Sequence, residues 1–295
     1  MTEEKLLNGV VDFHVHCYPS FMERACDFVE LCYMAEKAGY KAIGHKDHNY
    51  ASAGLAGEIK KHHFAESPLQ IFGTLAMNQS VGGMDPLVLE SALTFGTRAV
   101  WFPTVSAKNH IEFTQRVAGF PKAVSGPQTK PDPVVLIDEE GKLIPQAEEA
   151  LKILARYPDV AIGSGHGSPD EIDALVAKCV ELGIANRFFV DHPNEIIEAE
   201  LNDMIRWAKQ GAVIEFVAGM SVPPAEAFPL DTMIEYIRAI GVEHVVLLSD
   251  LGQKNKGNPV EVYGKFLKGL YDHGVSEDDI RYMTSYLPGK LVGLN

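Results

Sequence analysis

Two histidines one residue apart stand near the start of the chain, in the apolar run at residues 11–16. Side chains alternate along a β-strand with a period of two, so His14 and His16 are expected on the same face. Two imidazoles at that spacing can bind one metal ion from a rigid strand. Polar residues also end later apolar runs, at His48, His166, His192 and Asp250.

The elements that position these residues are short apolar segments that alternate with helical patterns. The predicted strands cover residues 10–16, 41–46, 70–77, 98–103, 160–164, 187–191, 212–217 and 244–249. Helix ends are marked by glycines that precede strands, Gly39, Gly96, Gly183, Gly211 and Gly241. Asp85 and Ser168 each precede a proline and predict helix N-termini. Eight such units predict an α/β fold, a (β/α)8 TIM-type barrel that forms one domain over residues 1–295.

One connection is much longer than the others. Residues 104–158 follow the fourth strand and contain a Pro/Gly-rich stretch, a predicted hairpin at 134–144 and a predicted helix at 146–157. A strand-to-helix connection of a barrel lies on its C-terminal face, where active sites form. We therefore expect a lid over the site, with a tolerated surface loop as the alternative.

Composition narrows the function classes. The formal charge of -14 argues against a nucleic-acid or anionic-membrane partner, because both require a basic surface. No apolar run reaches the roughly 20 residues of a membrane span, and the first residues do not resemble a signal peptide. The four cysteines lack CxxC spacing and are interpreted as reduced thiols of a cytoplasmic protein. Four lysines favour an acidic small-molecule substrate: Lys46, Lys108, Lys122 and Lys130.

The candidate ligands all follow the C-terminal ends of predicted strands, which converge on one mouth in a parallel barrel. Neutral imidazoles with a carboxylate suit zinc, with manganese, iron or nickel as alternatives, in a site of one or two ions. The predicted metal ligands are His14, His16, His48, His166, His192 and Asp250. Substrate contacts are expected from Asn78, His110 and Glu215, where a structural part in closing the barrel mouth is the alternative for Asn78 and Glu215. Supporting hydrogen bonds to the histidines are expected from Asp12, Asp47, Asp191 and Glu215.

The order HxH, His, His, Asp along the chain resembles the amidohydrolase superfamily of metal-dependent hydrolases. The residues that match this order are His14, His16, His166, His192 and Asp250. The resemblance covers nearly the whole chain. It includes residues 286–294, which are similar to a C-terminal motif common in that superfamily. It implies hydrolysis of an amide, a lactone or another carboxylic ester by metal-activated water. Asp250 would orient this water and accept its proton.

One feature departs from that superfamily. Many binuclear members carry a carboxylated lysine at the end of the fourth strand, whereas here residues 100–104 contain no lysine. Lys46 shares a face with His48 and could take this catalytic part. The alternative is that Lys46 is a plain ammonium that binds a substrate carboxylate or phosphate, beside a mononuclear site.

A second resemblance concerns the first two motifs, at residues 12–16 and 42–49. They are similar to the motifs of the polymerase-and-histidinol-phosphatase (PHP) family, which would imply phosphoesterase activity in a seven-stranded barrel. We favour the amidohydrolase resemblance because eight strands are predicted and residues 249–252 lack the usual PHP ending. A metal-dependent decarboxylase or lyase on the same scaffold is a further alternative, and a non-catalytic metal-binding module is another. Barrels of this kind often form homo-oligomers, but the sequence shows no diagnostic interface.

Overall fold

The computed structural model describes residues 1–118, 120, 123–130, 132–223 and 226–294. Eight parallel strands form one sheet in the order β1 to β8. They are β1 (Val11–Val15), β2 (Ala42–His45), β3 (Gln70–Ala76), β4 (Ala99–Trp101), β5 (Ala161–Gly163), β6 (Phe188–Val190), β7 (Val213–Val217) and β8 (Val245–Leu248). Each strand lies within the residues predicted for it, so the (β/α)8 barrel is confirmed.

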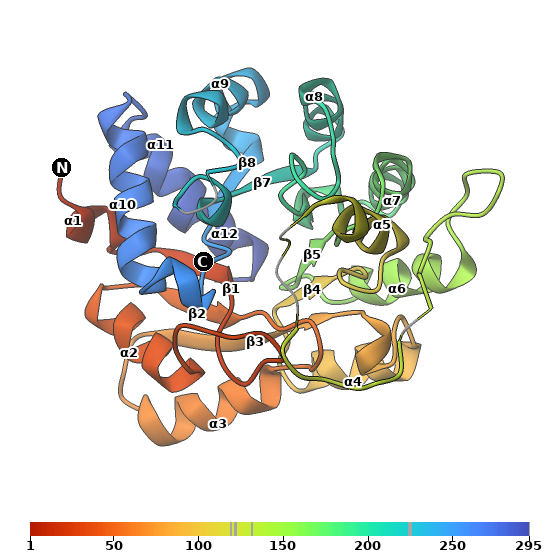
Figure 1. Cartoon of the computed structure of the whole chain (residues 1–295), viewed down its shortest axis with the longest axis horizontal. Coiled ribbons are helices and arrows are strands. Elements are labelled where there is room, and N and C mark those ends of the chain that lie inside the picture. Colours follow the sequence, from red (N-terminus) through yellow and green to blue (C-terminus); the bar gives the residue numbers. More distant parts are fainter. Residues whose placement is uncertain (119, 121–122, 131, 224–225, 295) are drawn as a thin grey trace.

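Helices surround the strands and connect them (Figure 1). They are α1 (Glu3–Leu7), α2 (Phe28–Lys37), α3 (Ala53–His63), α4 (Pro86–Thr94), α5 (Lys108–Arg116), α6 (Pro145–Ala155), α7 (Pro169–Glu181), α8 (Leu201–Lys209), α9 (Leu230–Ile240), α10 (Pro259–Asp272), α11 (Glu277–Arg281) and α12 (Leu287–Leu291). Short 3-10 turns lie at Gln79–Val81, Ala185–Arg187, Ala218–Met220, Val242–His244 and Lys254–Lys256, and a π-helical turn at Tyr282–Tyr286.

Helix N-termini form where the sequence predicts them. The carboxylate of Asp85 accepts hydrogen bonds from the first-turn amides of α4, at 2.9 and 3.2 Å. Ser168 and Glu171 form a capping box at the start of α7, which satisfies two backbone amides that the helix itself leaves free.

The barrel closes between β1 and the residues that follow β8. The amide of Asp250 donates to the carbonyl of His14 at 2.6 Å, and the amide of His16 donates to the carbonyl of Leu251 at 2.8 Å. This closure places two predicted metal ligands of β1 beside the predicted ligand of β8.

Aromatic side chains fill the barrel interior below the strand ends. Trp101 contacts Phe13 and Phe189 with ring centroids 6.1 and 5.5 Å apart, and all three are fully buried. Gly163 provides the space, because a Cβ there would lie 2.5 Å from Trp101 and 2.7 Å from Phe189. The His14 ring also packs on Trp101, so this aromatic layer forms the floor of the site.

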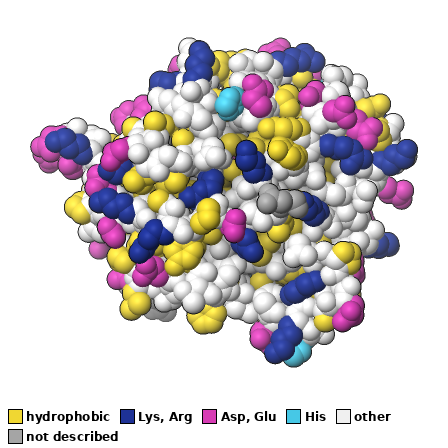
Figure 2. All heavy atoms as spheres, turned by 180° about the vertical axis from the view of Figure 1, so that it is seen from behind, with side chains coloured by type: hydrophobic (Ala, Val, Ile, Leu, Met, Phe, Trp, Pro, Cys, Tyr) yellow, Lys and Arg dark blue, Asp and Glu magenta, His cyan; other side chains and the backbone are white. Residues whose placement is uncertain are grey.

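The long connection follows β4 and contains α5 and α6. The predicted hairpin is a tight turn in which the amide of Asp138 donates to the carbonyl of Lys142, next to one antiparallel bridge between Ile137 and Leu143. In the described residues, no helix combines the length and apolar character needed to cross a membrane. On the face seen in Figure 2, basic and acidic side chains are interspersed among apolar ones.

Candidate metal centre

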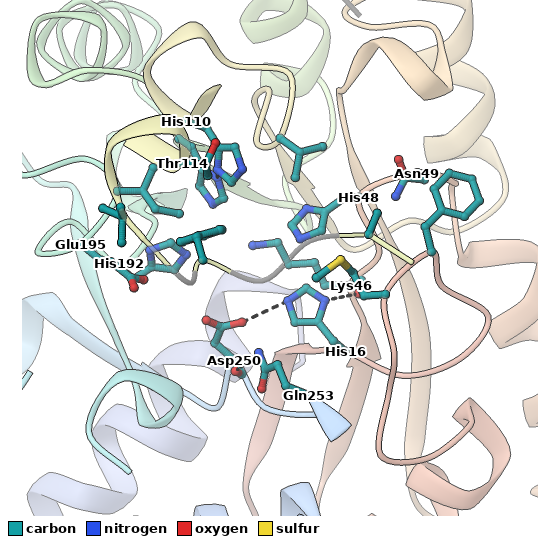
Figure 3. A pocket seen from close by; sticks show the side chains of 18 of the residues that line it. His16, Lys46, His48, Asn49, His110, Thr114, His192, Glu195, Asp250 and Gln253 are labelled. Atoms are coloured by element: carbon teal, nitrogen blue, oxygen red, sulfur yellow. Dashed lines mark hydrogen bonds and ion pairs between the residues drawn. The ribbon is translucent and has the colours of Figure 1, made fainter. Parts of the chain in front are cut away.

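A cavity of about 690 Å³ opens where the strands end. All six predicted metal ligands line it, together with Lys46 and His110. Figure 3 shows His16, His48, His110 and His192 turned toward one another with the Lys46 amine among them. Residues that are far apart in the sequence therefore meet in one place, as the strand-end argument predicted.

A β-bulge aims the first histidine pair into this cavity. The pairing of β1 with β2 shifts register between Asp12 and Val15. Strict alternation would put Phe13 and His14 on opposite faces, yet both contact Trp101 inside the barrel. Bulges next to functional sites commonly redirect a side chain in this way.

Two groups of donor atoms could each hold a cation, and they share His14. The first group is His14, His16 and Asp250, and the second is His14, Asp191 and His192; within each group the donor atoms lie within 4.8 Å of one another. Asp250 Oδ1 lies 3.4 Å from His14 Nε2 and 3.1 Å from His16 Nε2. His166 adjoins the second group, with Nε2 3.3 Å from Asp191 Oδ2.

The chemistry of these donors fits a divalent metal ion. His166 Nε2, Asp191 Oδ1 and His192 Nδ1 are buried and have no hydrogen-bond partner among the described residues. Buried polar atoms normally find a partner, and a bound cation would satisfy lone pairs that no donor reaches. His192 and Asp250 also adopt positive φ angles of 26° and 44°, which are uncommon for non-glycine residues and occur at many functional sites.

Hydrogen bonds behind the first histidine pair orient the rings. His14 Nδ1 lies 2.7 Å from Glu215 Oε1, and His16 Nδ1 lies 2.9 Å from the carbonyl of Lys46. A proton on Nδ1 donates to each oxygen, which leaves the Nε2 lone pair of both rings directed into the cavity. This tautomer is the one that a metal ligand requires.

Electrostatics keep Asp250 and Asp191 ionised. Burial alone would raise the pKa of Asp250, but the charge of His14 and hydrogen bonds from His14 and His16 hold the pKa well below its usual range. Burial also opposes ionisation of Asp191, and the charges of Lys46, His192 and His14 outweigh it, so its pKa is lowered too. Burial, reinforced by the charge of Arg24, lowers the pKa of His16 to about 3. Burial opposes protonation of His14, but the carboxylates of Glu215, Asp250 and Asp191 raise its pKa to about 10. His16 is therefore the neutral imidazole of the pair, and a metal ion that binds His14 Nε2 would have to displace a proton.

Lys46 is fully buried between the two donor groups. Its Nζ lies 2.8 Å from His14 Nε2 and 3.2 Å from Asp191 Oδ2, and 4.5 Å above the Trp101 ring. The amine thus shares the His14 lone pair that an ion would use.

Two further histidines involve the long connection after β4. His48 is held by Thr104 of this connection, and His110 belongs to it. His48 Nδ1 lies 2.9 Å from Thr104 Oγ1, and His48 belongs to neither donor group. His110, on α5, stacks on His166 with the two Nδ1 atoms 2.8 Å apart. His110 therefore both lines the cavity and orients a candidate ligand, whereas the sequence predicted a substrate contact alone.

Two predicted substrate contacts lie behind the cavity wall. The Asn78 amide donates to the carbonyl of His48 and to Thr104, and its oxygen accepts from the amides of Thr104 and Ser106. Glu215 is fully buried, and its second oxygen accepts from the amide of His192 at 3.2 Å. The protein itself makes these hydrogen bonds, and neither side chain lines the cavity. Substrate contact by Asn78 and Glu215 stays a prediction, with the structural part as its alternative.

His45, Lys108 and Lys130 belong to neither donor group. His45 is buried, forms hydrogen bonds with the carbonyl of Cys17 and with Tyr50, and packs on Phe28. Lys108 pairs with Glu112 on α5. Lys130 is exposed, and Lys122 lies outside the described residues.

Comparison with protein families places the chain. The model of a family of unknown function, DUF6282, matches residues 9–215, well over half of the sequence. The chain belongs to the DUF6282 family. None of the curated proteins compared with it matches significantly.

Solved structures share the fold of this DUF6282 protein. An amidohydrolase from Pseudomonas aeruginosa is similar with a TM-score of 0.63 and 9% identity, over 99% of this chain and 100% of that one. A 2,6-dihydroxybenzoate decarboxylase from Rhizobium has a TM-score of 0.58 and 11% identity, over 97% and 99%. A lactonase from Listeria monocytogenes has a TM-score of 0.54 and 15% identity, over 98% and 96%. These proteins share the barrel fold with the chain. The resemblance to the PHP family stays a prediction.

Several residues that line the DUF6282 cavity were not singled out from the sequence. Arg24, Glu195 and Gln253 lie in loops after β1, β6 and β8, and their side chains border the cavity. Asp191 was expected only behind the ligands, yet it lies at the centre of the second donor group. Its position directly before His192 at a strand end was the available signal.

Proposed function

We propose that the chain is an enzyme, a metal-dependent hydrolase that cleaves an amide, lactone or other carboxylic ester bond of a small molecule. The observation that carries this proposal is the pair of donor groups sharing His14 at the mouth of the barrel, beside a cavity of about 690 Å³. Small-molecule sites have volumes of this order, about 300 to 1,000 Å³. The names of the structural relatives, which include an amidohydrolase and a lactonase, support the same reaction class.

His14, His16 and Asp250 would hold the ion, with zinc favoured by their nitrogen and oxygen donors and manganese, iron or nickel as alternatives. When bound, such an ion polarises a scissile carbonyl and lowers the pKa of an attacking water towards about 7. His166, His192 and Asp191 would complete this site or hold a second ion. His48, which reaches the same cavity, would contact substrate or a second ion.

Asp250 is the proposed proton carrier. Its side chain is 18% exposed, whereas the other carboxylate among the donors, Asp191, is fully buried. The lowered pKa of Asp250 keeps it ionised and able to accept a proton from the attacking water. The same carboxylic acid would then protonate the leaving nitrogen or oxygen.

Lys46 would act as a fixed positive charge beside the reacting carbonyl. Its Nζ lies 3.2 Å from Asp191 Oδ2 and 4.5 Å from the centre of the Trp101 ring, two contacts that stabilise a cation. We further propose that segment 104–158, whose α5 contributes His110 and Thr114 to the cavity wall, covers the bound substrate.

The expected setting follows from the same observations. A small molecule is the proposed partner, in a cytoplasmic protein, and the four free, buried cysteines are consistent with a reducing compartment. The acidic sequence supports the proposal that neither nucleic acid nor an anionic membrane is bound.

Metal removal tests the proposal. The purified protein is stripped with a chelator, reloaded with zinc or manganese, and screened against lactones, amides, carboxylic esters and phosphate esters. We expect turnover of a carbonyl substrate to disappear on stripping and to return on reloading. Turnover that survives stripping would refute metal-assisted catalysis. Product masses separate the alternatives, because hydrolysis adds water and decarboxylation removes carbon dioxide.

A further inference from the structure

Arg24 stands in the loop between β1 and α2 and lines the same cavity as His16 and Asp250. The residue is only 6% exposed. Its backbone is held on both sides of the loop, because Arg24 forms an antiparallel bridge with Gln253 and the amide of Ala25 donates to the carbonyl of Gly252 at 2.8 Å. Backbone contacts between two loops at the barrel mouth therefore fix the position of the Arg24 main chain.

The charge of Arg24 has no close counter-ion. Its Nε donates to Ser20 Oγ at 3.0 Å, and within the described part of the chain its guanidinium makes no other hydrogen bond and no ion pair within 4.0 Å. A guanidinium carries five N–H donors, so four are left. Charged side chains that are buried to this extent are normally paired, because burial of an unpaired charge is costly.

The other charged residues of the cavity wall do not supply a partner. Lys46 is already paired with Asp191 at 3.2 Å. Glu195 lies on the His192 side, whereas Gln253, the bridge partner of Arg24, lies beside Asp250 (Figure 3). Asp47 and Asp250 are the carboxylates that act most strongly on Arg24, yet neither reaches ion-pair distance. Among the described residues of the cavity wall, Arg24 is therefore a cation without a counter-ion, next to the proposed reaction centre.

We propose that Arg24 binds a carboxylate of the substrate, so that the substrates are small carboxylic acids that also carry the scissile amide, lactone or ester bond. This inference rests on the proposed function and specifies its substrate class. The planar guanidinium fork matches a carboxylate through two parallel N–H donors. One positive charge balances one carboxylate, whereas a dianionic phosphate would leave excess negative charge near Asp47 and Asp250. In a chain with a net charge of -14, such a local cation is what an anionic substrate requires.

Binding of a matched pair of probes tests the inference without turnover. Phenylacetate and phenylacetamide have the same shape and differ in charge, and phenyl phosphate provides the phosphate arm. Their dissociation constants are measured by calorimetry on the metal-loaded protein, for the wild type and for Arg24→Gln. We expect the wild type to prefer phenylacetate and Arg24→Gln to weaken its binding by about 100-fold, since loss of one partner of a buried charge pair has that order of effect. The phenylacetate-to-phenylacetamide preference should collapse.

Two further variants make the result specific. Arg24→Lys keeps the charge without the fork, so its affinity for phenylacetate should lie between those of the wild type and Arg24→Gln. Arg238→Gln removes an exposed arginine of α9 and should retain the wild-type preference.

Four outcomes would overturn the inference. Equal affinity of the wild type for phenylacetate and phenylacetamide is the first, and an unchanged preference in Arg24→Gln is the second. In the second case a lowered melting temperature would show that Arg24 only offsets the charge of Asp47. Tighter, Arg24-dependent binding of phenyl phosphate is the third and would assign the site to phosphate. The fourth is wild-type protein that binds none of the probes. Turnover that survives metal stripping would instead refute the proposed metal-dependent hydrolysis. The measured affinities for the probes would still show whether Arg24 binds a carboxylate.

Discussion

The hydrogen bond from His14 to Glu215 offers a direct test of the candidate metal centre, because it sets the tautomer of the His14 ring. Glu215 accepts from His14 Nδ1 at 2.7 Å and from the amide of His192 at 3.2 Å, and both contacts are fully buried. Burial raises the pKa of Glu215 to about 8, against the charge and the hydrogen bond of His14, so the comparison is made above pH 8, where the carboxylate offers two acceptors. Glu215→Gln keeps the shape but offers one acceptor and one donor to two N–H groups. One of the two contacts must therefore set a donor against a donor.

Either arrangement weakens the site. If the amide nitrogen faces His14 Nδ1, the ring takes the other tautomer and the proton on Nε2 blocks the ligand atom. If the amide nitrogen faces His192, a buried N–H loses its acceptor, which costs about 1–3 kcal/mol. Loss of such a supporting partner typically weakens metal binding about 10- to 100-fold. That range corresponds to about 1.4–2.8 kcal/mol.

Zinc affinity, measured by competition with a chromophoric chelator, is the assay. A matched control is Glu171→Gln, a buried glutamate outside the cavity that also accepts from two backbone amides, those of Leu136 and Ser168. The control should lower the melting temperature and retain zinc affinity. If Glu215→Gln bound zinc as tightly as the wild type while folding normally, the reasoning about tautomers would be refuted.

Three other changes extend the test. Asp250→Asn still offers an oxygen to the ion, so at saturating zinc it should retain the metal in elemental analysis, while turnover falls by about 10²- to 10⁴-fold, the usual contribution of a proton-transfer group. Turnover close to wild type would exclude Asp250 as the proton carrier. His110→Phe keeps the stacked ring but removes the partner of His166 Nδ1, so metal affinity should fall about 10-fold or more; a change in melting temperature alone would mean that His166 binds no ion. Asp191 and the Trp101 face both stabilise a cation at Lys46, so the intact mass of the loaded protein should show no added carbon dioxide. A mass increase equal to carbon dioxide in the wild type would contradict this expectation. If Lys46→Met lost both that mass and a second ion, Lys46 would be a bridging carbamate.

The sequence predicted the barrel well for a physical reason. Strands buried on both faces must be apolar, and glycines and capping residues mark the ends of several helices as local signals. Residues at the C-terminal ends of such strands must converge, so His14, His16, His48, His166, His192 and Asp250 could be grouped from their positions after predicted strands.

Features that depend on exact side-chain paths were not accessible from the sequence. The bulge in β1 leaves no compositional mark, although it decides that His14 points into the barrel. Asn78 carries groups suited to substrate binding, and only the positions of Thr104 and Ser106 show that they are already used. Arg24 lies in a loop with no periodic pattern, and its burial without a counter-ion emerges only when the loops after β1 and β8 pair.

An anomalous-scattering map of zinc-loaded crystals tests the central claim most directly. We predict a peak about 2.0–2.2 Å from His14 Nε2, His16 Nε2 and an Asp250 oxygen, the usual zinc distances for these atoms, with Lys46 Nζ displaced from His14. Zinc found only elsewhere in the protein, or a map with no peak beside these three residues at saturating zinc, would contradict the account.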